Sequence, residues 1–393
     1  MSVYLDYAAS TPLNENVKDW VIEHLDVFGN PSSPHQYGVE CRNIIDTARE
    51  NIADYMRCNT DEIFFTSGAS QANTLALSFR CDNIFYTPIE HSSIIEGVNY
   101  LSTGSYHPVR TYPLKVNTDG TVDLNHLEYH LSYESNSNDN LVVIQWANNE
   151  IGTIQNISEI ADLVHIYDGL LFVDATQVFP WLKAMDLVKV IDKIDMLSAS
   201  AHKCGGMQGT GILYVKNDSS MFSPTLWMHP VVFGHQENGF IGGTENTLSI
   251  GAFGEAVKYL PSFAEMLTVL ENRNFLFKEI NRKISNVNLN GPNLDEFGVG
   301  DLKRLPNNLN IAINGVNNDV LMQLLDSMGI YCSGGSACNS HILEPSHVLM
   351  AIGLSKELAN QSIRLTIDKY FDAGASIQLV NRMKPLIDMI RAK

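Results

Sequence analysis

Leu197-Ser198-Ala199-Ser200-Ala201-His202-Lys203 begins as an apolar strand, continues in small residues and ends on a lysine. Small residues also dominate the stretch from Cys204 to Gly211, so the lysine lies between two flexible segments. A lysine amine becomes a nucleophile toward carbonyl groups when it is desolvated or lies near positive charge. Considered alone, however, a lysine after a strand is usually a solvated surface residue.

A carboxylate upstream of this lysine changes the interpretation. Asp174 ends the apolar run Leu170–Val173, which predicts a buried strand. In pyridoxal phosphate enzymes a lysine bonds to the cofactor aldehyde, and a carboxylate keeps the pyridinium nitrogen protonated so that the ring withdraws electrons. Lys203 and Asp174 therefore predict a site for this cofactor at the ends of two strands.

The rest of the first two thirds of the chain alternates short apolar runs with amphipathic stretches. Such alternation predicts crossover connections and a mostly parallel sheet flanked by helices, which is the α/β class. Ligands bind such sheets at the carboxyl ends of the strands. Strands are expected at residues 63–65, 83–86, 141–146, 170–174, 195–198 and 211–216, and helices at 37–56, 71–77 and 157–166.

Small residues join the first expected strand to the helix that follows it. The run Thr66-Ser67-Gly68-Ala69-Ser70 precedes that helix. Free backbone N–H groups and the helix dipole at such a point favour an anion such as phosphate. An ordinary capped helix explains the same pattern equally well.

The pattern changes near residue 255, and the remainder predicts a smaller α/β domain. We expect a helix-rich segment to residue 284, strands at 309–313, near 331 and at 363–367, and helices at 319–328 and 376–391. The predicted domains are 13–255 and 256–393, with residues 1–12 joined structurally to the second.

Composition excludes several classes of protein. Among 393 residues, 26 are Lys or Arg and 44 are Asp or Glu, and the net charge of −18 argues against direct nucleic-acid binding. No apolar run approaches the roughly 20 residues that span a bilayer, and no basic leader precedes Asp6, so we expect a cytoplasmic protein without membrane contact. The six cysteines lack the close pairs typical of metal sites, so no metal site is predicted.

Several short motifs resemble one family. Together, and in this order, they resemble the cysteine desulfurases, which belong to aminotransferase class V among the fold-type I pyridoxal phosphate enzymes. The likeness covers nearly the whole chain. The motifs are Tyr4-Leu5-Asp6-Tyr7-Ala8-Ala9-Ser10-Thr11-Pro12, Gly29-Asn30-Pro31-Ser32-Ser33, Glu90-His91, Asn148-Asn149-Glu150-Ile151-Gly152, Asp174-Ala175-Thr176-Gln177, Ser200-Ala201-His202-Lys203 and Ser336-Ala337-Cys338.

The resemblance implies a role for each matching residue near the cofactor. Lys203 would bond to pyridoxal phosphate, Asp174 would contact the ring nitrogen, and His91 would stack on the ring and move protons. Asn149 would approach the ring or the substrate carboxylate, and Gln177 the ring hydroxyl. The phosphate would be bound by Ala69, Ser70, Ser200 and His202.

Two further residues match family positions outside this cluster. Thr244, in Gly242-Gly243-Thr244, matches a threonine that reaches the phosphate of the neighbouring subunit, which implies a homodimer. Arg364 matches the residue that binds the substrate carboxylate, for which a planar guanidinium is well suited.

Cys338 lies in a run of small and polar residues, which predicts an exposed loop where a thiolate can react. Its spacing from Leu343-Glu344-Pro345 matches the desulfurases with a long loop, in which the cysteine removes sulfur from L-cysteine and carries it as a persulfide to an acceptor. Cys204 is expected to point away from the site, and Cys332 to be buried at a strand end.

The chain also departs from the family pattern. Gly206-Met207-Gln208-Gly209 replaces the usual Gly-Pro-Lys-Gly, and Asn238 and Ile241 replace two arginines. These differences put a housekeeping role in iron–sulfur assembly in doubt, so the sulfur-acceptor protein could belong to an iron–sulfur scaffold, a tRNA-thiolation system or a DNA-phosphorothioation system. Alternatives for the chain itself are a class V aminotransferase, a selenocysteine lyase or an inactive sulfur-relay scaffold.

Overall fold

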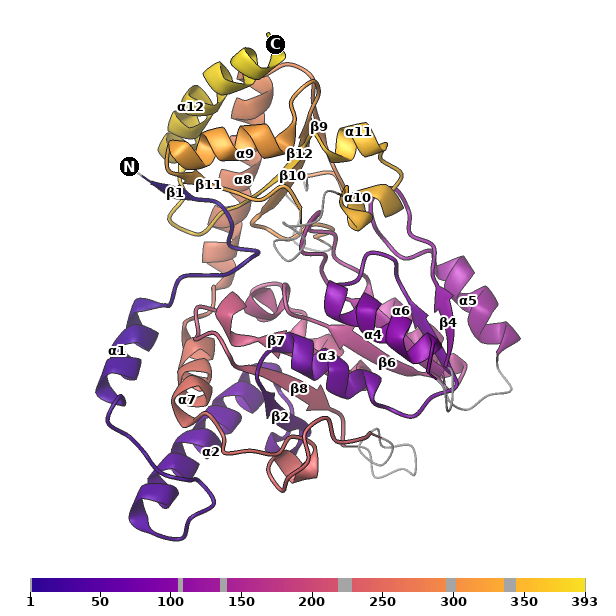
Figure 1. Cartoon of the computed structure of the whole chain (residues 1–393), viewed down its shortest axis with the longest axis vertical. Coiled ribbons are helices and arrows are strands. Elements are labelled where there is room, and N and C mark those ends of the chain that lie inside the picture. Colours follow the sequence, from indigo (N-terminus) through magenta and orange to yellow (C-terminus); the bar gives the residue numbers. More distant parts are fainter. Residues whose placement is uncertain are drawn as a thin grey trace.

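The computed structural model describes residues 2–104, 109–134, 140–217, 228–294, 302–335 and 344–392. Within these ranges the largest sheet has seven strands, in the order β2-β8-β7-β6-β5-β3-β4, and it fills the lower half of the molecule (Figure 1). The strands are β2 Ile63–Thr66, β3 Asn83–Tyr86, β4 Arg110–Pro113, β5 Asn140–Gln145, β6 Leu170–Asp174, β7 Met196–Ser200 and β8 Gly211–Val215.

Both faces of the central part of this sheet are apolar, because strands such as β5 and β6 are apolar at most positions. On β5, Val142 and Ile144 pack with one set of helices, whereas Leu141 and Val143 pack with the other set. This is the alternation expected of a strand that is covered on both sides. The first set is α2 Gln36–Met56, α5 Leu124–Tyr133, α6 Ile157–Ile166 and α7 Thr247–Ala256, and the second set is α3 Ala69–Leu77 and α4 Ser92–Ser102.

The predicted mostly parallel sheet is confirmed, with one strand of opposite direction. Strands β4, β3, β5, β6 and β7 are parallel to one another, whereas β8 is antiparallel to both β7 and β2. Because β2 and β7 both oppose β8, they run in the same direction. The described strands of the sheet other than β8 therefore all end at one edge. Strand β4 was not predicted, because its sequence Arg-Thr-Tyr-Pro lacks an apolar run.

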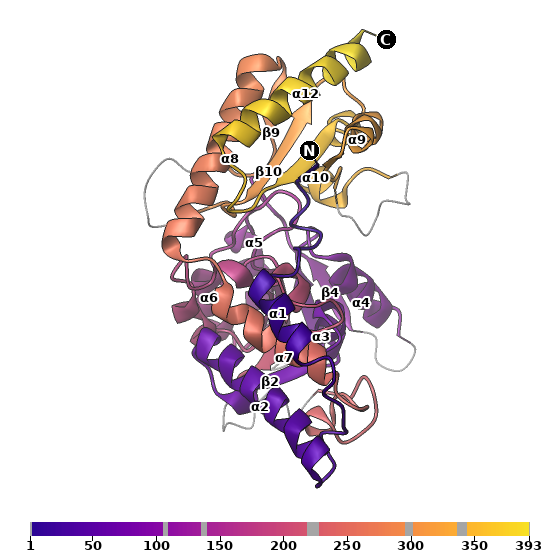
Figure 2. The same cartoon turned by 90° about the vertical axis from the view of Figure 1, so that its left-hand side faces the viewer.

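A second, smaller sheet lies in the upper half of the molecule. It has the order β12-β10-β9 and is antiparallel throughout. Helix α8 runs upward to it from the large sheet, and α12 packs along α8 (Figure 2). The bounds are α8 Phe263–Lys283, β9 Val287–Leu289, β10 Asn308–Ile313, α9 Asn318–Ser327, α10 His347–Ala351, α11 Lys356–Ala359, β12 Ser362–Thr366 and α12 Ala373–Arg391.

The N-terminal segment joins the upper half before the chain enters the large sheet. Strand β1 Val3–Tyr4 pairs in parallel with β11 Ile330–Tyr331. Asp6 then forms a bridge with Thr366, whose hydroxyl accepts a hydrogen bond from the Ala8 amide at 3.0 Å. Helix α1 Glu15–Glu23 follows and descends along the side of the molecule (Figure 1). None of the described helices has the length and apolar composition needed to cross a membrane.

Arg304 ties the two halves together at their junction. It is fully buried, and its guanidinium donates to three backbone carbonyls: Ile151 at 2.7 Å, Asn290 at 2.5 Å and Pro292 at 3.0 Å. Ile151 follows β5 of the large sheet, whereas Asn290 and Pro292 follow β9 of the small one. One side chain thus satisfies acceptors from both halves.

We expect Arg304→Met to destabilise the protein by about 3 kcal/mol, because the apolar side chain leaves several buried carbonyls without donors. The measurement is thermal unfolding of the variant beside the wild type. Lys258→Met is the control, since its half-exposed side chain pairs with Glu255 three residues before it, and surface changes of this kind usually stay within about 0.5 kcal/mol. Unchanged melting of Arg304→Met would contradict this role.

Candidate active site

The carboxyl edge of the large sheet gathers the polar residues that the sequence singled out. Gly68 follows β2, His91 follows β3, Asn149 follows β5, Asp174 ends β6 and Lys203 follows β7. Since these strands run in one direction, all five residues lie at the same edge. Parallel sheets bind their ligands at this edge.

Asp174 is held in a buried and fixed position. Only 2% of its surface is exposed. The Thr176 amide donates to its Oδ1 at 2.9 Å, and the Asn73 side-chain amide donates to its Oδ2 at 3.3 Å. Asn73 also donates to Ser93 Oγ at 2.9 Å. A carboxylate fixed in this way has an orientation set by its neighbours, before any ligand binds.

A chain of contacts leads from Asp174 to His91. Ser93 Oγ, which accepts from Asn73, lies 2.9 Å from Nδ1 of His91, and the Ser93 amide donates to the same nitrogen at 3.2 Å. Because Nδ1 accepts from that amide, the proton of a neutral His91 ring is on Nε2. Sequence reasoning missed Asn73 and Ser93, since an amide and a hydroxyl within helices carry no recognisable motif.

The amine of Lys203 contacts the N-terminal segment. Its Nζ donates to the carbonyls of Ala8 at 2.5 Å and Ala9 at 2.6 Å. Gln177 donates through Nε2 to the same Ala8 carbonyl at 2.9 Å. The segment that pairs with the upper half therefore also reaches the end of β7.

His202 is neutral at neutral pH. Burial of its ring, and secondarily the charge of Lys203, lower its pKa to about 4. Its Nδ1 lies 3.2 Å from Ser10 Oγ, and its carbonyl accepts from both the amide and the hydroxyl of Thr11. The N-terminal segment thus also orients the residue before Lys203.

The residues assigned to phosphate gather near the start of α3. Ala69 and Ser70 begin this helix, whose N-cap Gly68 has φ +149° and offers no side-chain cap. Ser200, at the end of β7, is buried, and its Oγ lies 3.8 Å from the position that a Cβ on Gly68 would take. A helix N-terminus without a side-chain cap suits an anion.

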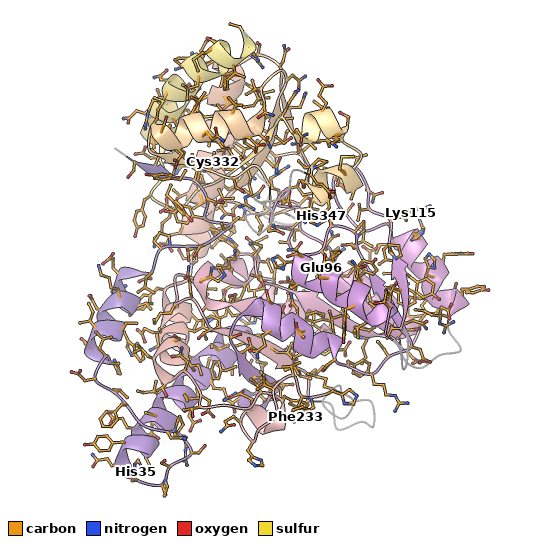
Figure 3. All side chains as sticks on the ribbon, viewed as in Figure 1. His35, Glu96, Lys115, Phe233, Cys332 and His347 are labelled. Carbon is orange, nitrogen blue, oxygen red and sulfur yellow. The ribbon has the colours of Figure 1, made fainter. Side chains whose placement is uncertain are left out.

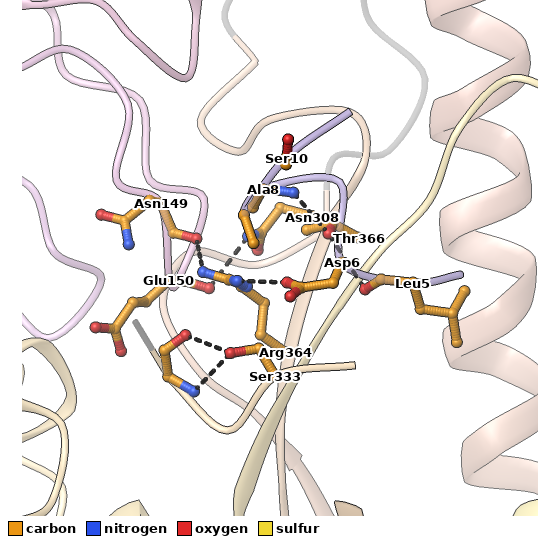
Figure 4. Close-up of polar contacts among 12 residues, drawn as sticks. Leu5, Asp6, Ala8, Ser10, Asn149, Glu150, Asn308, Ser333, Arg364 and Thr366 are labelled. Atoms are coloured by element: carbon orange, nitrogen blue, oxygen red, sulfur yellow. Dashed lines mark hydrogen bonds and ion pairs between the residues drawn. The ribbon is translucent and has the colours of Figure 1, made fainter. Parts of the chain in front are cut away.

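Arg364 lies on β12, across the junction from the large sheet. Figure 4 shows its guanidinium between two acceptors: Nη1 donates to the Asn149 carbonyl at 2.9 Å, and Nη2 forms an ion pair with Asp6 Oδ1 at 2.6 Å. The side chain is 1% exposed, and its Nε has no hydrogen-bond partner among the described residues. Sequence reasoning identified Arg364 and Asn149 separately but did not predict Asp6.

Thr244 is exposed in a loop that is anchored to the edge strand β2. The Glu237 carboxylate of this loop contacts Arg49 at 2.8 Å and accepts from the Phe65 amide at 2.8 Å. Gln236 Oε1 accepts from the Gly243 amide at 3.0 Å, next to Thr244. The loop therefore has a defined shape while its threonine faces outward, and Figure 3 labels Phe233 of the same loop at the lower surface.

Cys338 lies outside the described residues, so its position is not part of the described site. The neighbouring described residues approach the site from the upper half. His347 Nε2 lies 3.1 Å from the Glu90 carbonyl, and Ser346 donates to the Glu150 carboxylate at 2.5 Å. Gly335 lies beside the same carboxylate. Figure 3 labels Cys332 and His347 in this region.

The two other cysteines near the site are protonated at neutral pH. Cys204 is buried in the core, and burial raises the pKa of its thiol. Burial also raises the pKa of Cys332 to about 12, and the nearby Asp6 carboxylate adds to this effect. A thiol in this state is a poor nucleophile.

The residues present fit pyridoxal phosphate. Its aldehyde, ring nitrogen and phosphate need an amine, a buried carboxylate and an anion site, and Lys203, Asp174 and the start of α3 supply these groups at one edge. Thr176 Oγ1, two residues after Asp174, is buried without a hydrogen-bond partner in the described residues, which leaves a polar atom available beside the carboxylate.

A family model agrees with this architecture. The model of the aminotransferase class-V family matches residues 3–373. The chain belongs to the class-V aminotransferase family. Curated relatives of this class-V chain include "Cysteine desulfurase IscS" of Dictyoglomus turgidum, which is 37% identical over 381 residues and is matched over 94% of the chain and 90% of the relative.

Solved structures agree over nearly the whole class-V chain. A NifS-like protein from Rickettsia africae aligns with a TM-score of 0.82 at 29% identity, covering 99% of this chain and 100% of that one. A structure described as SspA in complex with cysteine aligns with a TM-score of 0.74 at 30% identity, covering 94% and 99%. The predicted fold-type I architecture and the resemblance to this family are confirmed.

Glu90 is a buried carboxyl that no site prediction included. Its Oε1 accepts from the Thr87 hydroxyl at 2.6 Å and from the Gln145 amide at 2.9 Å, while burial raises its pKa to about 8. The side-chain amide of Gln145 in turn donates to Asn149 at 3.1 Å. A protonated Glu90 thus supports the turn that carries Asn149.

We expect Glu90→Gln to melt progressively higher than the wild type as pH rises from about 5 to about 8. A carboxyl whose pKa is raised in the folded state contributes stability below its unfolded pKa and loses that contribution as pH rises through the folded pKa. Glutamine keeps the acceptor oxygen and does not ionise. Glu96→Gln is the control, because it removes a carboxylate at an exposed position of α4 (Figure 3). A melting difference for Glu90→Gln that does not change with pH would contradict this assignment.

Proposed function

We propose that this chain is a cysteine desulfurase that uses pyridoxal phosphate to convert L-cysteine to L-alanine and leaves the sulfur on Cys338 as a persulfide. The observation that carries the proposal is that Lys203 and the buried Asp174 lie at the ends of the adjacent strands β7 and β6. Arg364 faces the same edge of the sheet. Relatives named cysteine desulfurase over nearly the full chain support this choice over an aminotransferase, a selenocysteine lyase or an inactive scaffold.

When bound, pyridoxal phosphate withdraws electrons from the Cα atom of an amino-acid substrate. Asp174 would hold a proton on the ring nitrogen of the cofactor, and Asn73 and Thr176 fix the orientation of the carboxylate for this role. The Lys203 amine removes the Cα proton and later returns one. His91 would contact the cofactor ring and move protons through Nε2, which carries the proton of its neutral ring.

Arg364 and Asn149 bind the substrate carboxylate. The guanidinium is already oriented by the Asn149 carbonyl, so it needs little rearrangement to accept a carboxylate. Its position on β12 sets the distance between the carboxylate end of the substrate and Lys203. Gln177 would contact the ring hydroxyl of the cofactor.

Cys338 performs the sulfur transfer. Its thiolate attacks the substrate sulfur, a sulfur–sulfur bond forms, and the carbon–sulfur bond breaks with its electron pair remaining on the substrate carbon. That carbon takes up a proton, which yields alanine. Cys204 and Cys332 are poor substitutes because burial raises their thiol pKa values.

The phosphate of the cofactor would be held by Ala69, Ser70, Ser200 and His202, and by Thr244 from the second subunit of a homodimer. The exposed position of Thr244 on an anchored loop supports a contact outside its own subunit. The domains are 13–255, which holds the large sheet, and 256–393, which holds the small sheet and receives residues 1–12. The persulfide passes to a sulfur-acceptor protein. A cytoplasmic location stays a prediction from the sequence.

We expect Lys203→Ala to lose cofactor that withstands dialysis, because the covalent bond to the protein depends on this amine. Borohydride reduction of the wild-type holoenzyme, followed by peptide mass mapping, is expected to locate the cofactor on Lys203. Lys189→Ala, an exposed lysine that pairs with Asp186, serves as the control and keeps the cofactor. Cofactor mapped to any other lysine would refute the assignment.

We expect Cys338→Ser to bind cofactor and cysteine normally but to form alanine at least about a hundredfold more slowly, since a hydroxyl is a far poorer nucleophile toward sulfur than a thiolate. Alanine release and persulfide mapping by mass spectrometry measure the two products. Cys332→Ser is the matched control and is expected to retain persulfide formation. Alanine formation by Cys338→Ser at the wild-type rate, or a persulfide on Cys332, would sink this mechanism.

A further inference from the structure

Asp6 forms an ion pair with the guanidinium of Arg364, the group that the proposed function assigns to the substrate carboxylate. Its Oδ1 lies 2.6 Å from Nη2 of Arg364, and the two side chains are 18% and 1% exposed (Figure 4). We propose that Asp6 shares Arg364 with the substrate carboxylate and thereby weakens the binding of amino acids, the substrate and the product alanine alike. This inference rests on the proposed role of Arg364.

The backbone that carries Asp6 is held beside β12, which keeps its carboxylate next to Arg364. The residue before it is fixed on both sides, because the Leu5 amide donates to the Tyr331 carbonyl and the Leu5 carbonyl accepts from the Thr366 amide, both at 2.8 Å. The Asp6 carbonyl accepts from the Ala9 amide at 2.9 Å. An incoming carboxylate therefore meets Asp6 in place and must share the guanidinium with it.

Arg364 has the capacity to hold a second carboxylate. A guanidinium carries five N–H donors. One contact goes to Asp6 and one to the Asn149 carbonyl, while the buried Nε has no hydrogen-bond partner among the described residues. An unpartnered donor on a buried cation favours the arrival of an acceptor. Asp6 thus leaves N–H donors of Arg364 for the substrate carboxylate while it keeps its own contact.

Two carboxylates on one guanidinium repel each other, and that repulsion lowers the affinity for either ligand. The product alanine carries the same carboxylate as cysteine. An Arg364 without a protein counter-charge would bind alanine more tightly, and the product would leave more slowly. Asp6 therefore lowers the affinity for the product alanine and lets the product leave faster.

The test is the dissociation constant of L-alanine for the holoenzyme, followed by the absorbance change of the bound cofactor. The Asp6→Asn variant keeps an acceptor for Nη2 of Arg364 and removes the negative charge. We expect Asp6→Asn to bind alanine about tenfold more tightly, the size expected from removing one like charge in a partly screened site. Ethylamine, which is alanine without its carboxylate, is expected to bind both proteins equally.

Thermal unfolding provides a second measurement. Removing Asp6 leaves a buried cation without its counter-ion, so Asp6→Asn is expected to melt lower than the wild type without ligand. Alanine then supplies a counter-charge, and it is expected to raise the melting temperature more in the variant than in the wild type. If Asp6→Asn does not fold, Asp6→Ser, which also keeps an acceptor oxygen, is tested in the same way.

Two variants separate this inference from the proposed function. Asp368→Asn is the matched control, because Asp368 accepts from the Tyr7 hydroxyl of the same segment at 2.8 Å and is expected to leave alanine affinity unchanged. In an Arg364→Ala background, Asp6→Asn is expected to lose its effect on alanine binding. Unchanged or weaker alanine binding by Asp6→Asn, while Arg364→Ala weakens it, would overturn the role of Asp6 alone. Full alanine affinity in Arg364→Ala would remove the proposed carboxylate site as well.

Discussion

The N-terminal segment from Leu5 to Thr11 is the constraint on which the candidate site depends, because it contacts both halves of the molecule at once. Its Leu5 carbonyl bonds to β12, and its Ala8 and Ala9 carbonyls accept from Lys203 at the end of β7. Asp6 holds Arg364 from the small sheet, while Thr11 holds His202 from the large one. One segment, which pairs with the edge of the small sheet, thus contacts both the amine and the guanidinium.

This arrangement relates the fold to the proposed chemistry. An amino-acid substrate has its amine and carboxylate on one carbon, so Lys203 and Arg364 must lie at a distance that suits a small molecule. The large sheet positions Lys203 through β7, and the small sheet positions Arg364 through β12. Arg304 adds a second tie at the same junction by donating to carbonyls of both halves. The buried guanidinium groups of Arg304 and Arg364 thus connect the two halves that form the site.

Burial sets the protonation states around this junction. His202 stays neutral and Glu90 stays protonated because neither ring nor carboxyl is solvated enough to carry charge at neutral pH. The same effect keeps Cys204 and Cys332 as thiols. Charge remains where it has a partner, as in Arg364 with Asp6 and Arg49 with Glu237. The reactive thiolate that the chemistry requires is therefore not expected at Cys204 or Cys332.

The sequence by itself determined six of the seven strands of the large sheet, all but β4, and the residues at their ends. Apolar runs and helical spacing are local properties, and for that reason they predicted β6, β7, α2 and α6 and placed Asp174 and Lys203 at one edge. Only the tertiary structure decided the reversal of β8, the pairing of β1 with β11, the buried Glu90 and the contact of Asp6 with Arg364. Asp6 and Arg364 lie at opposite ends of the chain, and no local pattern records which distant carboxylate a buried guanidinium meets. Such contacts arise from packing, because a cation removed from water takes the acceptors that the folded backbone brings to it.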